Sequence, residues 1–429
     1  MQTAISVPPV KAANNYSAMF IIGILFFVFG FVTWLNSTLI PFLKLACQLD
    51  NDIQAFFVTF AFYMAYFFLA LPSSIILKKT GFKNGMALGL LVMSLGSLIF
   101  IPAANARHFG MFLTGLFVQG MGLALLQTAV NPYISIIGPI ESAAKRISIM
   151  GICNKVAGMA SPVILGAIVL KNATSLETQI LQTDDAVARN ILLDDLAARI
   201  ITPYIVIAIV LAILAFWIKR SPLPEIDTDK EDLSPDALVK PRSSIFKFPH
   251  LFLGVLCLFL YVGAEVMAGD AIGMYGKAMG MSLDETKYFT FFTLFAMLIG
   301  YIIGIATIPK IITQQTGLKI SAITGILFTI GVFFTDGYTA IVFIALLGLS
   351  NALMWPAIFP LAIDGLGRFT KTGSALLVMG IAGGALLPLL YGYLKDVVML
   401  TNSLSFFLCM IPCYVYILYY SIAGYKAGK

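Results

Sequence analysis

The chain contains twelve apolar stretches, each close to twenty residues long, and this succession limits its fold more than any other feature. A helix needs roughly 20 consecutive apolar residues to cross the hydrocarbon core of a bilayer. Backbone polar groups find no water there, so only helices and closed barrels can span it. Charged residues make up 11% of the sequence, whereas soluble domains have about 25%. The sequence therefore predicts an all-α, multi-pass membrane protein.

The apolar stretches fall into two groups of six. They run over residues 19–40, 54–77, 86–104, 111–137, 147–170 and 201–218, and then over 251–276, 288–308, 318–335, 339–363, 373–394 and 402–424. Residues 219–249 are the long charged, proline-rich stretch between the groups. We predict an N-terminal half at 1–218, a cytoplasmic linker at 219–249 and a C-terminal half at 250–429. The polar sequence at 184–200 predicts an amphipathic surface helix.

The positions of Lys and Arg set the expected orientation. Most of them lie in the N-terminal tail, the linker, the C-terminus and the loops on that same side. Such residues collect on the cytoplasmic side of short loops. We therefore predict both termini in the cytoplasm of a bacterial cell, with the chain in its inner membrane. These basic loop residues account for the net charge of +6, so no nucleic-acid partner is predicted. We also expect a monomer.

The two halves share a pattern of polar, glycine and proline residues. Gln127 and Asn131 stand four residues apart, so they lie on one face of a helix. Residues about half the chain apart match each other in five pairs: Gln127 with Asn351, Pro132 with Pro356, Gly158 with Gly384, Pro162 with Pro388, and Gly166 with Gly392. A parallel repeat predicts two similar six-helix halves around a central site, as in many secondary transporters.

Amides and aromatic residues lie inside the predicted spans. A single polar residue at such depth is usually an interhelical hydrogen bond. A cluster of amides beside flat rings, however, suits an uncharged polyhydroxylated ligand, because hydroxyls need paired donors and acceptors while a C–H face packs on a ring. The predicted substrate-binding residues are Asn36, Gln127, Asn131, Asn154, Asn351, Trp355, Trp34 and Tyr63.

Three charged residues lie clearly inside predicted spans, namely Lys155, Glu265 and Asp270. A charge at the bilayer centre costs a few kcal/mol, so such residues normally face a cavity and have a partner. We predict that these three bind a coupling ion or proton. Glu265 and Asp270 are about 140° apart on a regular helix and share a cavity only if that helix breaks. The residues that would permit a break are Gly263, Gly269, Gly273 and Gly276.

Lys155 has two opposed interpretations. In the first, Lys155 pairs with Glu265 and releases Glu265 when sugar or a cation binds. In the second, the Lys155 ammonium occupies a former cation site, and the protein is a uniporter. We prefer the pairing, because an unpaired charge at that depth is costly. The pairing requires the two side chains to approach each other across the interface between the halves.

Several segments in order along nearly the whole chain carry a resemblance to a known family. They are FFVFGFVTWLNSTLIPFLK, QAFFVTFAFYMAYFFLALPSSIILKKTGFKNG, GLALLQTAVNPYISIIGP, RISIMGICNKVAG and YVGAEV. The chain resembles the major facilitator superfamily, within it the fucose/proton symporter branch that also holds bacterial glucose/galactose transporters. The resemblance implies the major facilitator fold. The fucose symporters carry acidic residues where this chain has Ser37 and Gln127, so their proton mechanism is not transferred.

These observations predict a secondary active importer of a neutral monosaccharide, a hexose such as glucose or galactose, or fucose. We expect alternating access, coupling to Na⁺ or H⁺, and no other cofactor. A sugar uniporter, a membrane-embedded sugar sensor and an exporter of apolar drugs remain as alternatives. No enzyme is predicted, because no Ser/His/Asp or phosphate-loop constellation occurs. The five cysteines have no metal-ligand spacing, so no metal site is predicted either.

Overall fold

The computed structural model describes residues 13–136, 143–223, 244–308, 310–366 and 369–428, and it is helical throughout these ranges apart from connecting loops. Within them, eleven helical segments are long and apolar enough to cross a membrane. One of these, Asp52–Asn105, contains Gly81 at φ 78° and ψ 169°. Glycine adopts this non-helical conformation without steric cost. The segment therefore counts as two spans, which confirms the twelve predicted ones.

The N-terminal half holds the first six spans and two shorter helices. Its helices are α1 (Ala13–Thr33), α2 (Asn36–Ala46), α3 (Asp52–Asn105), α4 (Phe109–Ile136), α5 (Ala143–Val169), α6 (Ala173–Gln182), α7 (Ala186–Ala198) and α8 (Ile201–Arg220). Helix α7 confirms the surface helix expected at 184–200. It begins after Asp185, whose carboxylate accepts hydrogen bonds from the N–H groups of Val187 and Ala188. Helix α6 was not predicted.

The C-terminal half repeats this arrangement with more interruptions. Its helices are η3 (Ile245–Lys247), α9 (Pro249–Gly269), α10 (Ile272–Ala278), α11 (Leu283–Thr286), α12 (Phe289–Thr307), α13 (Gln314–Phe334), α14 (Gly337–Asn351), α15 (Met354–Ile363), α16 (Thr370–Met379), η5 (Gly380–Ala382), α17 (Gly383–Asp396), α18 (Asn402–Ile422) and η6 (Gly424–Lys426). Most of the predicted linker, residues 224–243, lies outside the described residues.

The first span of each half is interrupted, between α1 and α2 in the N-terminal half and between α9 and α10 in the C-terminal half. Helix α1 gives way to α2 at Trp34 and Leu35, where the Ser37 hydroxyl donates to the carbonyl of Trp34 at 2.8 Å. A side chain that bonds to the backbone in this way competes with regular helix geometry. Helix α9 ends at Gly269, and the N–H groups of Asp270 and Ala271 both bond to one carbonyl. The span expected over 251–276 is therefore broken at Gly269, one of the four glycines that would permit a break.

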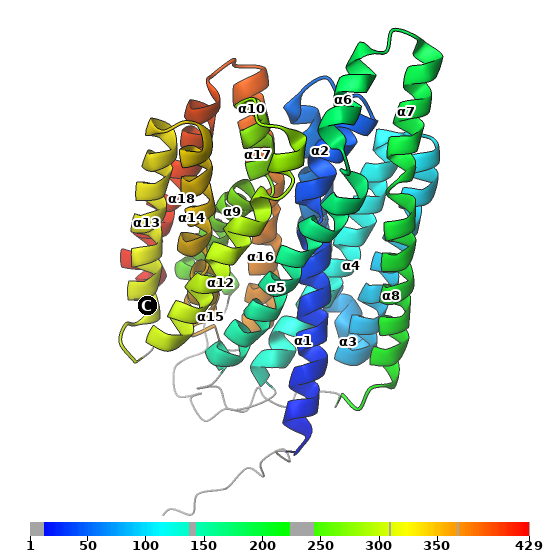
Figure 1. The fold of residues 1–429 in the computed structure, drawn as a ribbon. Helices are drawn as coiled ribbons and strands as arrows, with labels where there is room; N and C mark the ends of the chain where they lie inside the picture. Colours follow the sequence, from blue (N-terminus) through cyan, green and yellow to red (C-terminus); the bar gives the residue numbers. More distant parts are fainter. Residues whose placement is uncertain (1–12, 137–142, 224–243, 309, 367–368, 429) are drawn as a thin grey trace, which may run out of the picture.

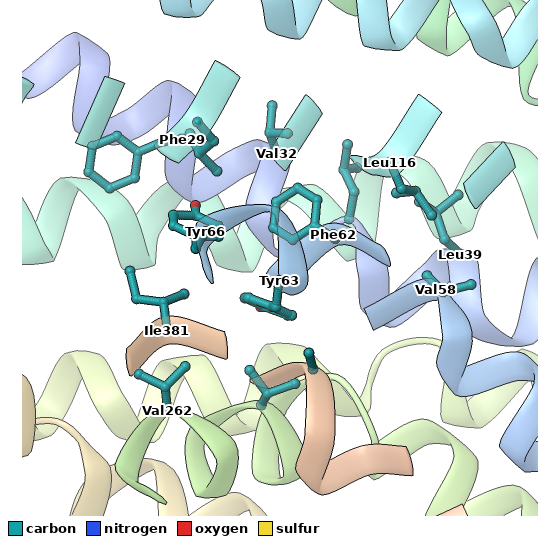
Figure 2. Packing of buried hydrophobic residues seen from close by; sticks show 14 of the residues in the cluster. Phe29, Val32, Leu39, Val58, Phe62, Tyr63, Tyr66, Leu116, Val262 and Ile381 are labelled. Carbon is teal, nitrogen blue, oxygen red and sulfur yellow. The ribbon is translucent and has the colours of Figure 1, made fainter. Parts of the chain in front are cut away.

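The helices of the two halves lie side by side and define two ends of the bundle (Figure 1). We call the end that carries α6, α7 and α10 the loop end, and the end near the start of α1 and the C-terminus the termini end. Between the halves, α5 packs on α12, while α3 packs on α16 and α17. In Figure 2, Tyr63 and Tyr66 of α3 face Val262 of α9 and Ile381 of η5. The site described below lies in this interface.

Close helix packing depends on small residues, as is usual within a bilayer. A Cβ atom on Gly30 of α1 would lie 2.3 Å from the carbonyl oxygen of Asn154 in α5. A Cβ atom on Gly120 of α4 would lie 2.3 Å from that of Phe62 in α3. Exposed apolar side chains such as Phe68, Leu95 and Ile213 cover the outside of the bundle. Such a surface suits lipid and would be costly in water.

Candidate functional site

A cavity lies between the halves and receives side chains from both. Its walls come from α1, α3, α4 and α5 in one half, and from α9, α12, α15 and η5 in the other. The space open to the centres of water molecules is about 120 Å³. One water molecule needs roughly 10–15 Å³ by such a measure. The cavity therefore has room for several waters or a small polar solute.

Most of the side chains predicted from the sequence meet in this cavity. Those that line it are Trp34, Tyr63, Gln127, Asn131, Asn154, Lys155, Glu265 and Trp355. Pro356, the repeat partner of Pro132, lines it as well. The lining amides, Gln127, Asn131 and Asn154, come from the N-terminal half, whereas the C-terminal half contributes Glu265 and aromatic rings such as Trp355.

The structure does not place Asn36 and Asn351 in the cavity lining, contrary to expectation. Asn351, fully buried at the end of α14, accepts a hydrogen bond from the Tyr414 hydroxyl at 2.9 Å. Asn36 is the first residue of α2 and is also fully buried. The physical reason is the same for both. Each residue adjoins a helix break, so its side-chain direction no longer follows from spacing along a regular helix.

The amides of the cavity wall are held by neighbouring groups. Gln127 Nε2 donates to the Tyr66 hydroxyl at 3.0 Å, and Asn154 Nδ2 donates to the Phe26 carbonyl at 3.5 Å. Tyr66 was missed by the sequence reasoning, although it follows Tyr63 by three residues and therefore shares its helix face. The two rings are stacked with centroids 6.5 Å apart.

Two further tyrosines that the sequence reasoning missed also line the cavity, Tyr261 of α9 and Tyr301 of α12. Tyr261 lies one turn before Glu265, so the same helical spacing could have identified it. No spacing to a polar residue identifies Tyr301, because the sequence of α12 around it is apolar and an aromatic residue there is expected to pack in the core. The cavity is thus richer in phenol groups than expected.

An ion pair crosses the cavity between the halves. Lys155 Nζ of α5 lies 2.7 Å from Glu265 Oε1 of α9, and these side chains are 7% and 12% exposed. The ammonium group also lies 4.7 Å from the centroid of the Trp34 ring, within the range of cation–π attraction. This is the approach across the interface that the pairing interpretation of Lys155 requires. Removing one partner of a buried pair typically costs about 3–5 kcal/mol.

Trp34 closes the cavity toward the loop end. Its ring is 3% exposed and packs between two glycines, Gly158 of α5 and Gly269 of α9. A Cβ atom on Gly158 would lie 2.4 Å from the ring, and one on Gly269 2.2 Å. Any larger residue at either position would therefore displace the indole. Along α1, α5 and α9, Trp34 and the Lys155–Glu265 pair are among the lining residues nearest the loop end.

Asp270 lies beyond this closure and outside the cavity lining. It follows the last residue of α9 and is 1% exposed. Its Oδ2 accepts a hydrogen bond from the Tyr63 hydroxyl at 3.3 Å, and its Oδ1 has no hydrogen-bond partner in the part of the chain that the structure describes. The helix does break at Asp270, but the break leaves Glu265 in the cavity and Asp270 in the packed interface.

Polar contacts join the halves at the loop end. Asp52 at the start of α3 binds both Lys44 of α2 and Lys395 of α17. Beside it, the Ile53 N–H donates to Asp396 at 2.9 Å. We call these residues, Lys44, Asp52, Ile53, Lys395 and Asp396, the Asp52 cluster. They hold the end of α17 against α3.

A second set of contacts joins the loop end between α6 and the α10–α12 region. Glu177 pairs with Lys277, and the Thr174 N–H donates to Asp284 at 3.2 Å. Lys287 donates to the carbonyl of Leu170 at 3.0 Å. The described ranges hold no group of three or more His, Cys, Asp or Glu side chains placed to bind a metal ion.

Comparison with known sequences agrees with this architecture. The family model described as Major Facilitator Superfamily matches residues 22–389. A glucose/galactose transporter of Brucella abortus biovar 1 (strain 9-941) is 33% identical over 421 residues, which cover 97% of this chain and 96% of that protein. An L-fucose-proton symporter of Escherichia coli (strain K12) is 28% identical over 375 residues, covering 87% and 85%.

Solved structures show the same similarity. A crystal structure of the E. coli fucose:proton symporter superposes with a TM-score of 0.75 at 25% identity, covering 95% of this chain and 98% of that one. A D-xylose-proton symporter structure superposes with a TM-score of 0.66 at 13% identity, covering 96% and 99%. At that identity the second likeness concerns the fold alone.

Proposed function

Because the chain belongs to the major facilitator superfamily, we propose that it imports a neutral monosaccharide by alternating access of its two six-helix halves. It is a transporter and not an enzyme. The names of its relatives point to a hexose such as glucose or galactose, or to fucose, as the substrate. The protein acts as a monomer in a bacterial inner membrane, with both termini in the cytoplasm and the loop end outside.

The cavity between the halves is the observation that carries this proposal. Gln127, Asn131 and Asn154 offer amides to sugar hydroxyls, and Trp355 offers a flat ring to a C–H face. The Lys155–Glu265 pair neutralises its own charge. A cavity with paired charges and several uncharged polar groups suits a neutral, hydroxyl-rich ligand better than an ion. An apolar drug would leave these polar groups unpaired.

Uphill import requires a cation whose binding differs between the two facing states of the carrier. The candidate residues for this coupling are Lys155, Glu265 and Asp270, which we call the charged cluster. Ser37 and Gln127, which stand where fucose symporters carry acids, cannot ionise. We therefore place coupling on the charged residues of α5, α9 and the end of α9 instead.

Transport assays in proteoliposomes test the function. Purified protein should exchange internal sugar for external radiolabelled D-glucose, D-galactose or L-fucose, while protein-free liposomes and L-glucose give the background. Imposed sodium and proton gradients, varied separately, then show whether sugar accumulates. A sensor would bind sugar without exchange, and a uniporter would exchange sugar without accumulation. Absence of exchange with all three sugars would contradict the proposed function.

A further inference from the structure

The two acidic residues of the charged cluster, Glu265 and Asp270, differ in whether a positively charged side chain contacts them. Glu265 has the Lys155 ammonium at 2.7 Å, so a protein side chain fills the place that a coupling cation would take. Asp270 has no ammonium or guanidinium partner among the described residues, and within them its Oδ1 forms no hydrogen bond, although the residue is 1% exposed. A buried carboxylate without a partner is costly, and it neutralises readily by taking up a proton.

Three helices of the N-terminal half face the Asp270 carboxyl. Tyr63 of α3 donates its hydroxyl to Oδ2, and the backbone of Ser37 in α2 faces the same carboxyl. Among the described residues, the charged groups near it are Lys155 of α5 and Glu265 of α9. Asp270 itself belongs to the C-terminal half. Its surroundings therefore change whenever the two halves move apart at the loop end.

The groups around Asp270 favour a proton over a metal cation. Hard cations need several oxygen ligands, and two carbonyls at the end of α9 each already accept one hydrogen bond. The Thr290 hydroxyl donates to the carbonyl of Gly269 at 2.7 Å, and the Thr293 hydroxyl donates to that of Ala268 at 2.8 Å. A proton needs one oxygen, and Asp270 Oδ1 supplies it.

We propose that Asp270 carries the coupling proton, that Tyr63 connects it to the cavity, and that the Lys155–Glu265 pair takes no part in proton binding. This inference rests on the proposed function and deepens it. When the loop end is open, water reaches Asp270, and its carboxylate takes a proton from hydronium to form an O–H bond. The neutral carboxyl can then be buried at low cost, so protonation favours closure of the loop end.

Release of the proton follows from the position of Tyr63, which both lines the cavity and contacts Asp270. The protonated carboxyl first turns about its Cβ–Cγ bond, so that its O–H replaces Oδ2 beside the Tyr63 hydroxyl. That O–H bond then breaks as its proton passes to the Tyr63 oxygen, while the Tyr63 hydroxyl gives its own proton to a water in the cavity. Tyr63 ends unchanged, and hydronium leaves through the cavity. The ionised Asp270 then disfavours the closed loop end, which returns the empty carrier to its open form.

The test measures proton movement together with sugar movement. Proteoliposomes at internal pH near 7.5 and external pH near 6.5 receive radiolabelled D-galactose, and one proton per sugar limits accumulation to about tenfold for one pH unit. Wild type should approach this limit and should alkalinise the external medium when sugar is added. Asp270→Asn should accumulate no sugar above the external concentration and move no protons, yet still exchange D-galactose.

Two more variants separate a proton carrier from a structural residue. Asp270→Glu should keep proton-driven accumulation with a displaced pH profile, because it preserves the carboxyl but changes its position. Tyr63→Phe should keep the ratio of protons to sugar but slow the proton-coupled step. If Asp270→Asn does not fold, the Asp270→Glu profile decides, and a profile identical to that of wild type would overturn the proposal.

Other outcomes also contradict the inference. Proton movement that persists in Asp270→Asn would place coupling elsewhere. If the same movement is lost in Glu265→Gln, Glu265 carries the proton instead. Accumulation that follows sodium and ignores pH would replace the proton with a metal cation. Sugar exchange by wild type without any proton movement would overturn this inference and leave the proposed function standing. No exchange at all would overturn the proposed function itself.

Discussion

Gln127 lines the cavity, and its Nε2 donates to the Tyr66 hydroxyl. We predict that Gln127→Ala weakens sugar binding, because a hydroxyl of the bound sugar would lose its hydrogen-bond partner in the cavity. The loss of about 1–3 kcal/mol per buried group corresponds to roughly a 5- to 100-fold rise in the sugar Kd. Equilibrium binding of radiolabelled sugar to purified protein measures it.

Asn351→Ala is the matched control, since it removes the amide that the repeat pairs with Gln127. The Asn351 side chain lies outside the cavity and holds the Tyr414 hydroxyl. We therefore expect a lower thermal unfolding temperature with sugar affinity within about twofold of wild type. Equal losses of sugar affinity in the two variants would contradict the placement of Gln127 in the sugar site and of Asn351 outside it.

Cys47, which follows α2 at the loop end, is partly buried. Burial raises the pKa of its thiol to about 11, although the nearby Arg107 lowers it slightly. Because the thiolate is the reactive form, alkylation at pH 8 should be roughly 100-fold slower than for an exposed cysteine with an ordinary pKa. The rate should rise about tenfold for each pH unit below that pKa.

N-ethylmaleimide kinetics in a variant with Cys153, Cys257, Cys409 and Cys413 changed to Ser measure this rate. Glutathione under the same conditions is the reference for an exposed thiol. A Cys47 rate equal to that of glutathione at pH 8 would contradict the burial that the structure shows.

At the scale of helices, the packing of α17 on α3 depends on Gly392. A Cβ atom on Gly392 would lie 2.9 Å from the Cα atom of Ile53, a backbone atom that cannot turn aside. We predict that Gly392→Ala hinders closure of the loop end and slows sugar uptake several-fold. Its repeat partner Gly166 has its nearest neighbour, Lys287 Cβ, at 3.8 Å. Gly166→Ala should therefore transport sugar at close to the wild-type rate.

Rates of D-galactose uptake at equal expression test this pair of variants. The two substitutions are chemically identical and occupy matching positions in the repeat. Equal rates in both would show that the contact with Ile53 does not limit closure.

The sequence predicted the spans well because their signal is local. Twenty apolar residues in a row indicate a membrane helix whatever lies beside it. The breaks in α1–α2 and α9–α10 were harder to locate, since they depend on contacts such as that of the Ser37 hydroxyl with the carbonyl of Trp34. Glycines near Asp270 marked the second break only approximately.

The cavity was predictable where helices stay regular through it. Gln127 and Asn131 share a helix face, and both line the cavity. Asn351 has the same spacing to Trp355 but a break intervenes, and it turns toward Tyr414 instead. Tyrosines such as Tyr301 were missed because an aromatic ring in an apolar span reads as packing. The Lys155–Glu265 pair was anticipated from the cost of an unpaired charge, which does not depend on knowing the fold.

At the scale of the whole molecule, the Asp52 cluster joins the halves through charges. Asp52 binds Lys44 and Lys395 and is 6% exposed. Replacing it with Asn removes the charge that both lysines share and leaves Asp396, 3.7 Å from Lys395, as the remaining carboxylate of the cluster. We predict that Asp52→Asn shifts the population toward an open loop end.

Spin labels at Asp184 and Val398, which are exposed at the loop end of opposite halves, report the distance between the halves. The distribution should move to longer distances in Asp52→Asn, and high salt should produce a smaller shift of the same sign in wild type by screening the partly exposed pairs. An unchanged distribution in Asp52→Asn would show that apolar packing alone holds this end closed.

The position of Trp34 gives the protein a built-in optical reporter. Its indole is enclosed by Gly158 and Gly269 from opposite halves and lies beneath the Lys155 ammonium. The chain has three tryptophans, so Trp217→Phe with Trp355→Phe leaves Trp34 as the single long-wavelength fluorophore. Separation of the halves would admit water to the ring and shift its emission to the red. Stopped-flow fluorescence could then follow each closure of the carrier in real time, without any attached dye.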